Sequence, residues 1–338
     1  MSLDLNIFYS AYIQYIKTVC ASGGKELVTA LITVGVLALL ISATLTGLAV
    51  IYKYIFKSPN KVQNDIHHLP SWEQYQQKKA EITAKTDALN ALPYEAVWIK
   101  SFDGYRLFGR YYHQKDGAPV NICFHGFRGT AVRDFCYAAE MIRNEGHNLL
   151  LVDQRAHGKS ESTCITYGIR ESRDCMSWLD YTVKRFGNTV KIVLSGVSMG
   201  ASTVLLAAGL NLPDNVKGIV ADSPYTSPKA IMQTVSARSK LNKKAAFAML
   251  WLAALVYGHF RLDRGDVIES VKKSRVPMIV FHGTGDSLIP YTMSEEIKAA
   301  NPEKVYLHLT EGAEHAFSIV VDAESYVSHL REFFEKII

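Results

Sequence analysis

Short apolar runs alternate with amphipathic segments through residues 93–338 of the chain. Short runs rich in valine, isoleucine and leucine are typical of buried strands, and apolar residues spaced three and four apart are typical of helices. The strand-like runs are 120–124, 147–152, 190–194, 216–221, 276–281 and 305–309. Helical patterns separate them, as at 134–144 and 171–185. Strands that alternate with helices predict an α/β fold, with a mostly parallel sheet covered on both faces.

Two further strands are predicted ahead of this series. Residues 95–99 and 105–112 flank Asp103-Gly104, a dipeptide typical of the tight turn of a β-hairpin. The region 93–338 is long enough to form one such domain with a sizeable core.

A different pattern fills the chain before residue 93. Residues 27–52 include no charged side chain, and a helix of this length crosses a hydrocarbon core of about 30 Å. We therefore predict a single-pass transmembrane anchor in the cell membrane. A cleaved signal peptide is the alternative, but the stretch is long, starts far from residue 1 and has no charged segment ahead of it. Residues 53–92 are predicted to form a linker and a helix, near 72–89, that leads into the following domain.

Residues 1–26 precede the predicted anchor and place apolar side chains, such as Phe8, Tyr12 and Val19, at helical spacing. This pattern predicts a helix that either lies in the membrane interface or packs against the anchor. The lysines around the anchor favour, by a margin of one, a cytoplasmic location for the C-terminal region. These lysines are Lys17 and Lys25 before the anchor and Lys53, Lys57 and Lys61 after it.

The pentapeptide Gly-Val-Ser-Met-Gly at 196–200 follows the run 190–194 and opens a helical stretch of small residues. This context is typical of a nucleophile elbow, in which a serine occupies a strained turn between a strand and a helix. Gly196 and Gly200 provide the small residues that such a turn needs on either side of Ser198. The sequence therefore identifies Ser198 as the candidate nucleophile.

A serine hydroxyl needs a histidine to take its proton and a carboxylate to orient that histidine. Asp286 follows the run 276–281 in a tight His-Gly-Thr-Gly-Asp loop, and His315 follows the run 305–309, just before a terminal amphipathic helix. Asp286 alone could be a helix cap, and any one of 11 histidines is more often structural. A serine, an acid and a base that each follow a strand predict a catalytic triad.

An oxyanion formed at Ser198 needs two preorganised N–H donors. The backbone N–H of Met199 is the first, because it follows the nucleophile directly. The backbone N–H of Phe127, on the loop after the run 120–124, is the predicted second donor. His125 of the same loop could be read as a base, but at this place we expect it to brace the loop.

Residues 93–338 resemble the α/β-hydrolases, and more narrowly the bacterial membrane-anchored hydrolases that are serine aminopeptidase-like or Bem46-like. The order Ser198, Asp286, His315 is that of the superfamily. The sequence Asp-Gln-Arg-Ala-His-Gly-Lys-Ser at 153–160 is similar to the family motif D-x-R-G-x-G-x-S, with Ala156 where glycine is usual. A further similarity is Ala-Asp-Ser-Pro-Tyr at 221–225. The resemblance implies the fold and a serine hydrolase mechanism, without a particular substrate.

Residues 227–274 occupy the place where this family inserts a cap. Within them, the uncharged segment 245–257 is too short to span a bilayer. It is either a cap helix packed over the active site or an interfacial helix that dips into lipid. Both alternatives predict an apolar wall for an acyl group near Ser198. The basic residues that precede the segment are Arg238, Lys240, Lys243 and Lys244.

Composition narrows the possible functions further. The chain has 37 basic and 32 acidic residues, and no nucleic-acid-binding motif accompanies the net charge of +5. Its five cysteines are an odd, scattered set that predicts no disulfide framework. Because metal-ligand spacing and phosphate-binding glycine motifs are missing, we expect no metal and no cofactor.

The sequence as a whole predicts a membrane-anchored serine hydrolase that cleaves carboxylic esters. A peptidase, amidase or thioesterase would use the same triad. A non-catalytic binding module with this fold is the alternative from another class. The predicted partners are a small-molecule or lipid-like acyl substrate and membrane lipid.

Overall fold

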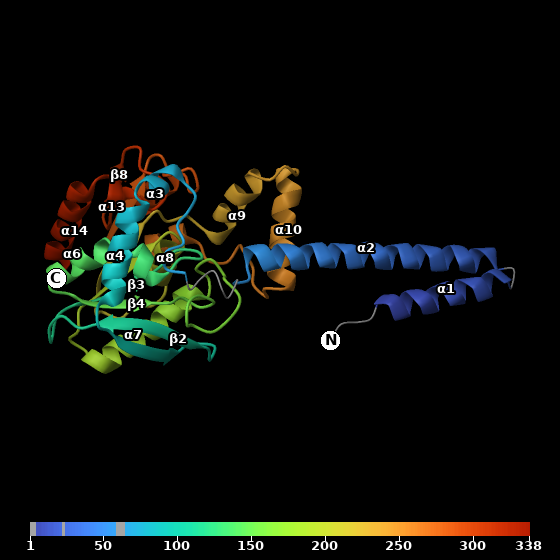
Figure 1. Ribbon diagram of the computed structural model, residues 1–338, viewed down its shortest axis with the longest axis horizontal. Helices are drawn as coiled ribbons and strands as arrows, with labels where there is room; N and C mark the ends of the chain where they lie inside the picture. The colour runs from blue at the N-terminus through green and yellow to red at the C-terminus, as the bar shows by residue number, and fades with distance from the viewer. Residues whose placement is uncertain (1–4, 22–23, 59–64) are drawn as a thin grey trace.

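The computed structural model describes residues 5–21, 24–58 and 65–338. An eight-stranded sheet in the order β1-β2-β4-β3-β5-β6-β7-β8 forms the centre of the molecule (Figure 1). The strands are β1 (Glu95–Lys100), β2 (Arg106–Tyr112), β3 (Val120–Phe124), β4 (Asn148–Val152), β5 (Ile192–Val197), β6 (Val216–Asp222), β7 (Met278–Gly283) and β8 (Val305–Thr310). Every strand end lies within three residues of its predicted position.

The pairing of the strands confirms the predicted fold class. Strands β3 to β8 pair in parallel with their neighbours, whereas β1 and β2 form an antiparallel hairpin and β2 is antiparallel to β4. Gly104 occupies the hairpin turn at a φ of +92°, a conformation that side chains with a Cβ avoid. The parallel strands all present their carboxyl ends at one edge, where ligands and reactive groups gather in such sheets.

Helices cover both faces of the sheet, and this explains why the central strands are apolar throughout. In β3, Ile122 faces a core formed with α7 (Glu171–Phe186), α8 (Met199–Ala208) and α11 (Val267–Lys273). The next residue, Cys123, faces a second core with α5, α6 and α14. Successive side chains of a strand point to opposite faces, so a strand buried on both sides shows no polar alternation. The other covering helices are α4 (Lys79–Ala91), α5 (Ala131–Asp134), α6 (Ala138–Asn144), α12 (Thr292–Ala300), α13 (Ser318–Val321) and α14 (Ala323–Ile337).

Helix α2 (Lys25–Ile55) projects away from the sheet domain (Figure 1). It is the one helix in the described part of the chain that is long and apolar enough to cross a membrane. Helix α1 (Leu5–Ala21) returns alongside it, and the Gly35 N–H donates a hydrogen bond to the Tyr12 hydroxyl at 3.1 Å. In the described residues of this segment, α1 packs against α2, and the choice between the two alternatives for residues 1–26 stays a prediction. The Phe8 side chain and Lys61 lie outside the described residues.

The end of α2 is fixed to the domain by several hydrogen bonds. The Ile165 N–H donates to the Phe56 carbonyl at 2.8 Å, and the Tyr167 hydroxyl donates to the Ile55 carbonyl at 3.0 Å. The Arg128 guanidinium, on the loop after β3, donates to the Tyr54 carbonyl at 2.5 Å. We call these contacts of residues 54–58 the exit clamp.

The predicted helix near 72–89 is two helices, α3 (Glu73–Gln77) and α4, separated at Lys78. The two helices have different tasks, since α4 packs Leu89 into the core beside α6, while α3 contacts the loop that follows β8. One straight helix would not reach both the core and the loop after β8. The polar sequence of residues 72–89 does not reveal the break at Lys78.

Residues 227–274 form α9 (Pro228–Ala237), α10 (Lys243–Val256) and α11. Helix α10 packs against α2 and α9 and crosses α2 at a steep angle (Figure 1). Its small and apolar residues Ala246, Leu250, Ala253 and Ala254 are buried, and its other face is exposed.

Candidate active site

Ser198 occupies a strained turn between β5 and α8. Its φ of 55° and ψ of −114° lie outside the regions that non-glycine residues favour. A Cβ on Gly196 would clash with the backbone of Gly200, and a Cβ on Gly200 would clash with the carbonyl of Phe124. Close backbone contacts on both sides of the serine therefore explain why small residues are needed there, as predicted.

The structure brings Ser198, His315 and Asp286 into one hydrogen-bonded chain. The Ser198 Oγ lies 2.7 Å from the His315 Nε2, and the His315 Nδ1 lies 2.6 Å from the Asp286 Oδ2. In the neutral tautomer that this arrangement favours, the Nδ1–H donates to the carboxylate and the Nε2 accepts from the serine hydroxyl. Asp286 and His315 are both buried, with 8% and 6% of their surface exposed.

Asp286 is held by donors on three sides. The backbone N–H groups of Leu288 and Ile289 donate to its Oδ1 at 2.8 Å each. The Nε2 of His282 lies 3.1 Å from its Oδ2. Burial by itself raises the pKa of Asp286, but the hydrogen bonds from His282 and His315 outweigh it, so the pKa of this carboxyl lies well below its usual range. The acid is therefore ionised and fixed in orientation.

His282 is a positioning residue that the sequence did not single out. It is fully buried, and its Nδ1 lies 2.6 Å from the Ser294 Oγ, so the serine fixes the ring that contacts Asp286. Its place at the end of β7, four residues before the acid, is the one sequence signal that could have identified it.

The backbone beside His315 is held from two directions. The Ala316 N–H donates to the Ser223 Oγ at 3.1 Å, which ties the loop to the end of β6. The Tyr75 hydroxyl of α3 donates to the His315 carbonyl at 3.0 Å and lies 3.3 Å from the Ala316 carbonyl. Ala316 has a φ of 53°, so the loop is held in a strained conformation.

Other residues of the segment 65–92, which we call the lead-in segment, extend this contact. The Gln74 side chain donates to the Gly312 carbonyl at 2.8 Å and accepts from the Glu314 N–H at 3.0 Å. The Trp72 ring stands edge-on to the imidazole of His315, with 5.7 Å between centroids. We call residues 72–75 the α3 clasp; nothing in their sequence pattern indicated a role at the site.

The two predicted oxyanion donors come from different elements, the start of α8 and the loop after β3. Met199 is the first residue of α8, where backbone N–H groups have no partner within the helix. Phe127 follows Gly126 in the loop after β3 and lines the same pocket as Ser198. Neither N–H forms a hydrogen bond with another group in the described part of the chain. Both are therefore free to donate to a bound ligand.

Two buried histidines brace the loop that carries Phe127. The His125 Nδ1 lies 2.8 Å from the Gly126 carbonyl, and its Nε2 accepts from the Gln154 N–H at 3.1 Å. The His157 Nε2 accepts from the Arg128 N–H at 3.0 Å. Burial lowers the pKa of both imidazoles, which stay neutral. With both of its ring nitrogens engaged, His125 is placed as a brace and lies outside the chain of Ser198, His315 and Asp286.

Asp134 supports the same loop from α5. Its Oδ2 accepts from the Gly126 N–H at 2.8 Å, and its Oδ1 lies 2.7 Å from an Arg133 guanidinium nitrogen. The peptide next to Phe127 is therefore fixed by a charged group, which orients the predicted donor before any ligand arrives.

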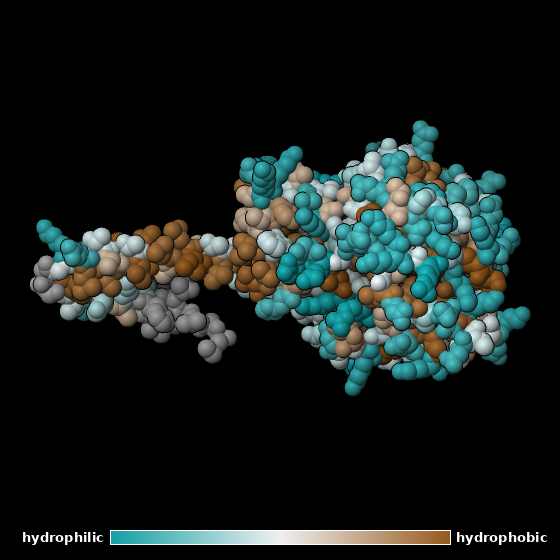
Figure 2. Space-filling view, turned by 180° about the vertical axis from the view of Figure 1, so that it is seen from behind, coloured by the Kyte–Doolittle hydropathy of each residue, from teal (hydrophilic) through white to brown (hydrophobic). Residues whose placement is uncertain are grey.

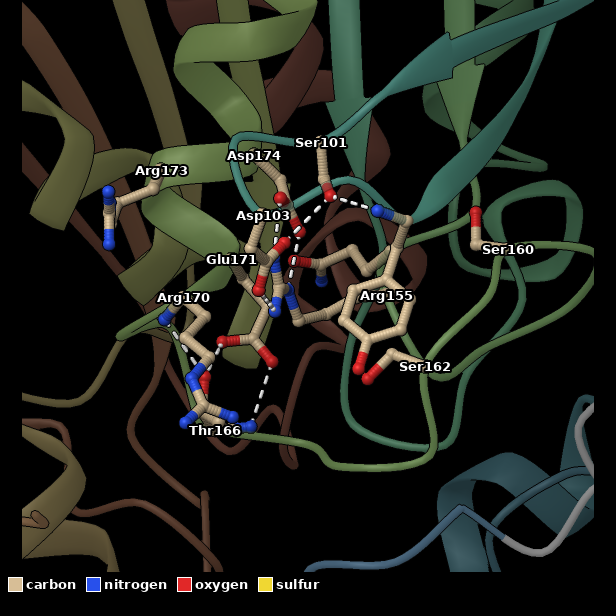
Figure 3. A network of polar contacts seen from close by, with 12 residues as sticks. Ser101, Asp103, Arg155, Ser160, Ser162, Thr166, Arg170, Glu171, Arg173 and Asp174 are labelled. Atoms are coloured by element: carbon tan, nitrogen blue, oxygen red, sulfur yellow. Dashed lines mark hydrogen bonds and ion pairs between the residues drawn. The ribbon is translucent and has the colours of Figure 1, made fainter. Parts of the chain in front are cut away.

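A buried ion network lies behind residues 153–160 (Figure 3). The fully buried Arg155 bonds Asp174 through its Nε and Nη2 at 2.6 and 2.7 Å. It also bonds both carboxylate oxygens of Asp103 at 3.0 Å. The network joins the β1–β2 turn to α7 and supports the segment that contains His157. Ala156, next to Arg155, has a φ of 62°, a conformation that glycine adopts more easily, and glycine is the residue at this place in the similar family motif.

A pocket of about 210 Å³ opens at Ser198 and is mostly apolar. Its walls come from the lead-in segment, the loop after β3 and the residues after His315. The principal lining residues are Leu69, Trp72, Tyr75, Phe127, Tyr137, Leu288 and Phe317. None of the described residues that line it belongs to 227–274. The expected acyl wall from the cap was therefore wrong, because α10 packs against α2 and leaves this wall to residues 69–82.

In the described ranges, no three histidine, cysteine or acidic side chains lie close enough together to hold a metal ion. The histidines near Ser198 are instead engaged in hydrogen bonds with protein groups.

The strand order, the serine turn after β5 and the histidine loop after β8 together define the α/β-hydrolase fold. A sequence profile that describes the alpha/beta hydrolase fold matches residues 119–264. The chain thus has this fold and resembles the α/β-hydrolase superfamily, as its sequence indicated. The narrower resemblance to serine aminopeptidase-like and Bem46-like hydrolases stays a prediction.

Two curated proteins illustrate the similarity in sequence. YqkD of Bacillus subtilis is 24% identical over 241 residues, which cover 71% of this chain and 79% of YqkD. The alpha/beta hydrolase domain-containing protein WAV2 of Arabidopsis thaliana is 23% identical over 261 residues, which cover 74% of this chain and 82% of WAV2.

Solved structures show the same fold. The esterase Pf2001 of Pyrococcus furiosus is similar with a TM-score of 0.58 and 22% identity, covering 80% of this chain and 98% of its own. Est1E from Butyrivibrio proteoclasticus, solved with ferulic acid, has a TM-score of 0.56 and 21% identity, covering 72% of this chain and 99% of its own.

Proposed function

We propose that this protein is a membrane-anchored serine hydrolase that cleaves carboxylic esters through an acyl-enzyme on Ser198. The observation that carries the proposal is the continuous chain from the Ser198 Oγ through His315 to Asp286, with distances of 2.7 and 2.6 Å, at an apolar pocket. This geometry is that of an activated nucleophile.

In the first half of the reaction, the Ser198 Oγ attacks the ester carbonyl carbon while its proton passes to the His315 Nε2. The carbonyl electrons move onto oxygen, and the N–H groups of Met199 and Phe127 receive that oxyanion. The intermediate then collapses, the C–O bond to the alcohol breaks, and the His315 Nε2–H protonates the leaving oxygen. Asp286 stays ionised throughout and stabilises the imidazolium.

In the second half, water replaces the alcohol. His315 takes a proton from this water, and the resulting hydroxide attacks the acyl carbon. The same two N–H groups receive the second oxyanion. Its collapse breaks the bond to the Ser198 Oγ, which regains its proton from His315, and the carboxylic acid leaves.

The preference for esters rests on similarity to solved structures. Pf2001, which has this fold, is named as an esterase. Est1E, which also has this fold, was solved with ferulic acid bound. A peptidase, amidase or thioesterase remains the alternative, because an amide or thioester carbonyl would meet the same groups.

Membrane anchoring through α2 is part of the proposal. Only 6% of the 18-residue window that defines the candidate span is buried, so the described part of the chain leaves most of its apolar surface uncovered. The lysines, three after the anchor and two before it, favour a cytoplasmic location for the sheet domain. Membrane lipid is the proposed partner of α2.

The proposal is tested with the full chain in membranes and a fluorophosphonate probe, which bonds to activated serines. We expect the wild type to be labelled and Ser198→Ala to be unlabelled, whereas Ser177→Ala on α7 serves as the matched control and keeps its label. Labelling that persists in Ser198→Ala would contradict the assignment of the nucleophile.

A substrate panel separates the alternatives. p-Nitrophenyl esters, the matching thioesters and aminoacyl p-nitroanilides are compared by kcat/KM on the same preparation. Turnover confined to the anilides would favour the peptidase. A folded wild type that neither labels nor turns over any substrate would favour the binding module.

A further inference from the structure

Helix α10 carries an apolar face that the described part of the chain leaves partly exposed. Trp251, Leu252, Leu255 and Val256 are between 37% and 42% exposed, on the side opposite the buried Ala253. Exposed aromatic and aliphatic residues gathered on one helix face mark an interaction surface more often than chance exposure does. We call these four residues the α10 face.

The α10 face lies beside the proposed membrane anchor. The Tyr257 hydroxyl at the end of α10 donates to the Leu45 carbonyl of α2 at 2.9 Å, and Leu48 is buried at the same crossing. Figure 1 shows α10 running crosswise to α2. A helix that is perpendicular to a membrane-spanning helix lies parallel to the bilayer surface.

The length of α2 places this crossing at the level of the bilayer surface. The 26 uncharged residues 27–52 extend about 39 Å as a helix. A hydrocarbon core of about 30 Å accommodates about 20 of them. Counted from the charged pair Lys25 and Glu26, the core ends near Leu45, where α10 makes its contact. Figure 2 shows the apolar surface of α2 continuing onto the adjacent edge of the domain.

The charge around α10 indicates which kind of surface it meets. Residues 223–262 contain no acidic side chain and six basic ones. All six are exposed, and three of them lie at the start of α10: Lys240 before the helix, and Lys243 and Lys244 in its first turn. Cations near an anionic bilayer are attracted to its surface. The basic residues of the segment are Lys229, Arg238, Lys240, Lys243, Lys244 and Arg261.

We propose that α10 lies on an anionic phospholipid bilayer, with the α10 face in the interfacial layer and the lysines at its N-terminal end among the headgroups. Such a helix is a second membrane contact, distinct from the α2 anchor, and together they fix the orientation of the sheet domain. The inference rests on the proposed anchoring by α2 and is independent of the proposed hydrolysis.

The test uses the full chain in liposomes of phosphatidylglycerol and phosphatidylcholine with brominated acyl chains, which quench tryptophans in contact with lipid. We expect the Trp251→Phe variant to lose most of the quenching seen in the wild type. Trp98→Phe is the matched control, because Trp98 is 45% exposed on β1. We expect that variant to keep the quenching.

Charge supplies an independent comparison. Replacing Lys240, Lys243 and Lys244 with glutamine should reduce the quenching of Trp251 to the level seen in liposomes of phosphatidylcholine alone. Equal quenching in both lipids, for the wild type and the glutamine variant alike, would overturn the anionic preference.

The outcomes separate this inference from the proposed function. A chain that floats with the liposomes but shows equal quenching in wild type and Trp251→Phe would overturn the α10 contact and leave the anchor standing. The same result with crosslinked dimers would assign the α10 face to a second copy. A chain that does not float would overturn both the contact and the anchor, and fluorophosphonate labelling would still report on Ser198.

Discussion

At Asp286, a buried carboxyl is kept ionised by the groups that surround it. Because its pKa is lowered in the folded chain, the folded state binds fewer protons than the unfolded state in acid. Its contribution to stability is therefore present above the ordinary aspartate pKa of about 3.9 and is lost as the pH falls below that value towards the folded pKa.

The lowered pKa of Asp286 leads to a prediction for the pH dependence of stability. The free energy of unfolding should fall as the pH drops from 5 to 3, and Asp286→Asn should flatten that dependence, as measured by urea unfolding at each pH. Asp116→Asn is the control, because that side chain is fully exposed. An unchanged pH dependence in Asp286→Asn would show that the carboxyl is not held as described.

His282 leads to a prediction for activity. We expect His282→Gln to lower kcat for ester hydrolysis about 10- to 100-fold with little change in KM, since a misplaced catalytic group costs up to about 10²-fold while leaving substrate contacts intact. Steady-state kinetics with a short ester checks this. The half-buried His308, on β8, is the control as His308→Gln. A change confined to KM would argue for a role in substrate binding instead.

The sequence identified Ser198, Asp286 and His315 because each follows an apolar run and lies beside turn residues. It did not identify His282, His157 or Ser223 as supports. Their roles depend on which strand ends are neighbours in the sheet, and the pattern of one strand does not contain that information. The roles assigned to the triad and to Phe127 and Met199 stay predictions, although the structure brings these groups together.

Among the elements, α3 shows how far pattern analysis reaches. The strands were predictable because a strand buried on both faces reads as a continuous apolar run. Helix α3 has five residues, and its important side chains, Gln74 and Tyr75, are polar or amphipathic. Its contacts are with a loop more than 200 positions away. Neither local propensity nor periodicity carries such long-range information.

The α3 clasp gives a prediction at this scale. Tyr75→Phe removes the hydroxyl that bonds the His315 carbonyl but keeps the ring, which lies 4.4 Å from Phe317 between centroids. A hydrogen bond of about 0.5–1.5 kcal/mol corresponds to a loss of about 2- to 10-fold in kcat. Burst and steady-state kinetics measure the loss. Tyr306→Phe on β8 is the control, and equal kinetics in both variants would contradict a positioning role for Tyr75.

For the whole molecule, the pocket is a joint product of the lead-in segment and the sheet domain. Its volume of about 210 Å³ lies below the range of about 300–1,000 Å³ that is common for drug-sized ligands. We therefore expect short acyl groups to react best. In a series of p-nitrophenyl esters, kcat/KM for the acetate and butyrate should exceed that for the dodecanoate about 10-fold or more.

Two variants test whether the size of the pocket limits the acyl chain length that the protein accepts. Widening the pocket by Leu69→Ala should raise kcat/KM for the longer esters relative to the acetate, whereas Leu210→Ala, at an exposed position after α8, should leave the ratio unchanged. A wild type that prefers the dodecanoate would show that the wall formed by residues 69–82 does not limit the substrate.

The exit clamp has a consequence for how a membrane-bound chain would meet its substrate. Arg128, next to the predicted oxyanion donor Phe127, donates a hydrogen bond to the Tyr54 carbonyl near the end of α2. With α2 as the proposed anchor, the distance between the bilayer and Ser198 would be set by the direct contacts of residues 54–58 with the sheet domain, and not by the length of a tether. A site held at one height accepts an ester only if its carbonyl reaches that height, so vertical reach from the membrane becomes a criterion of selection in addition to acyl size.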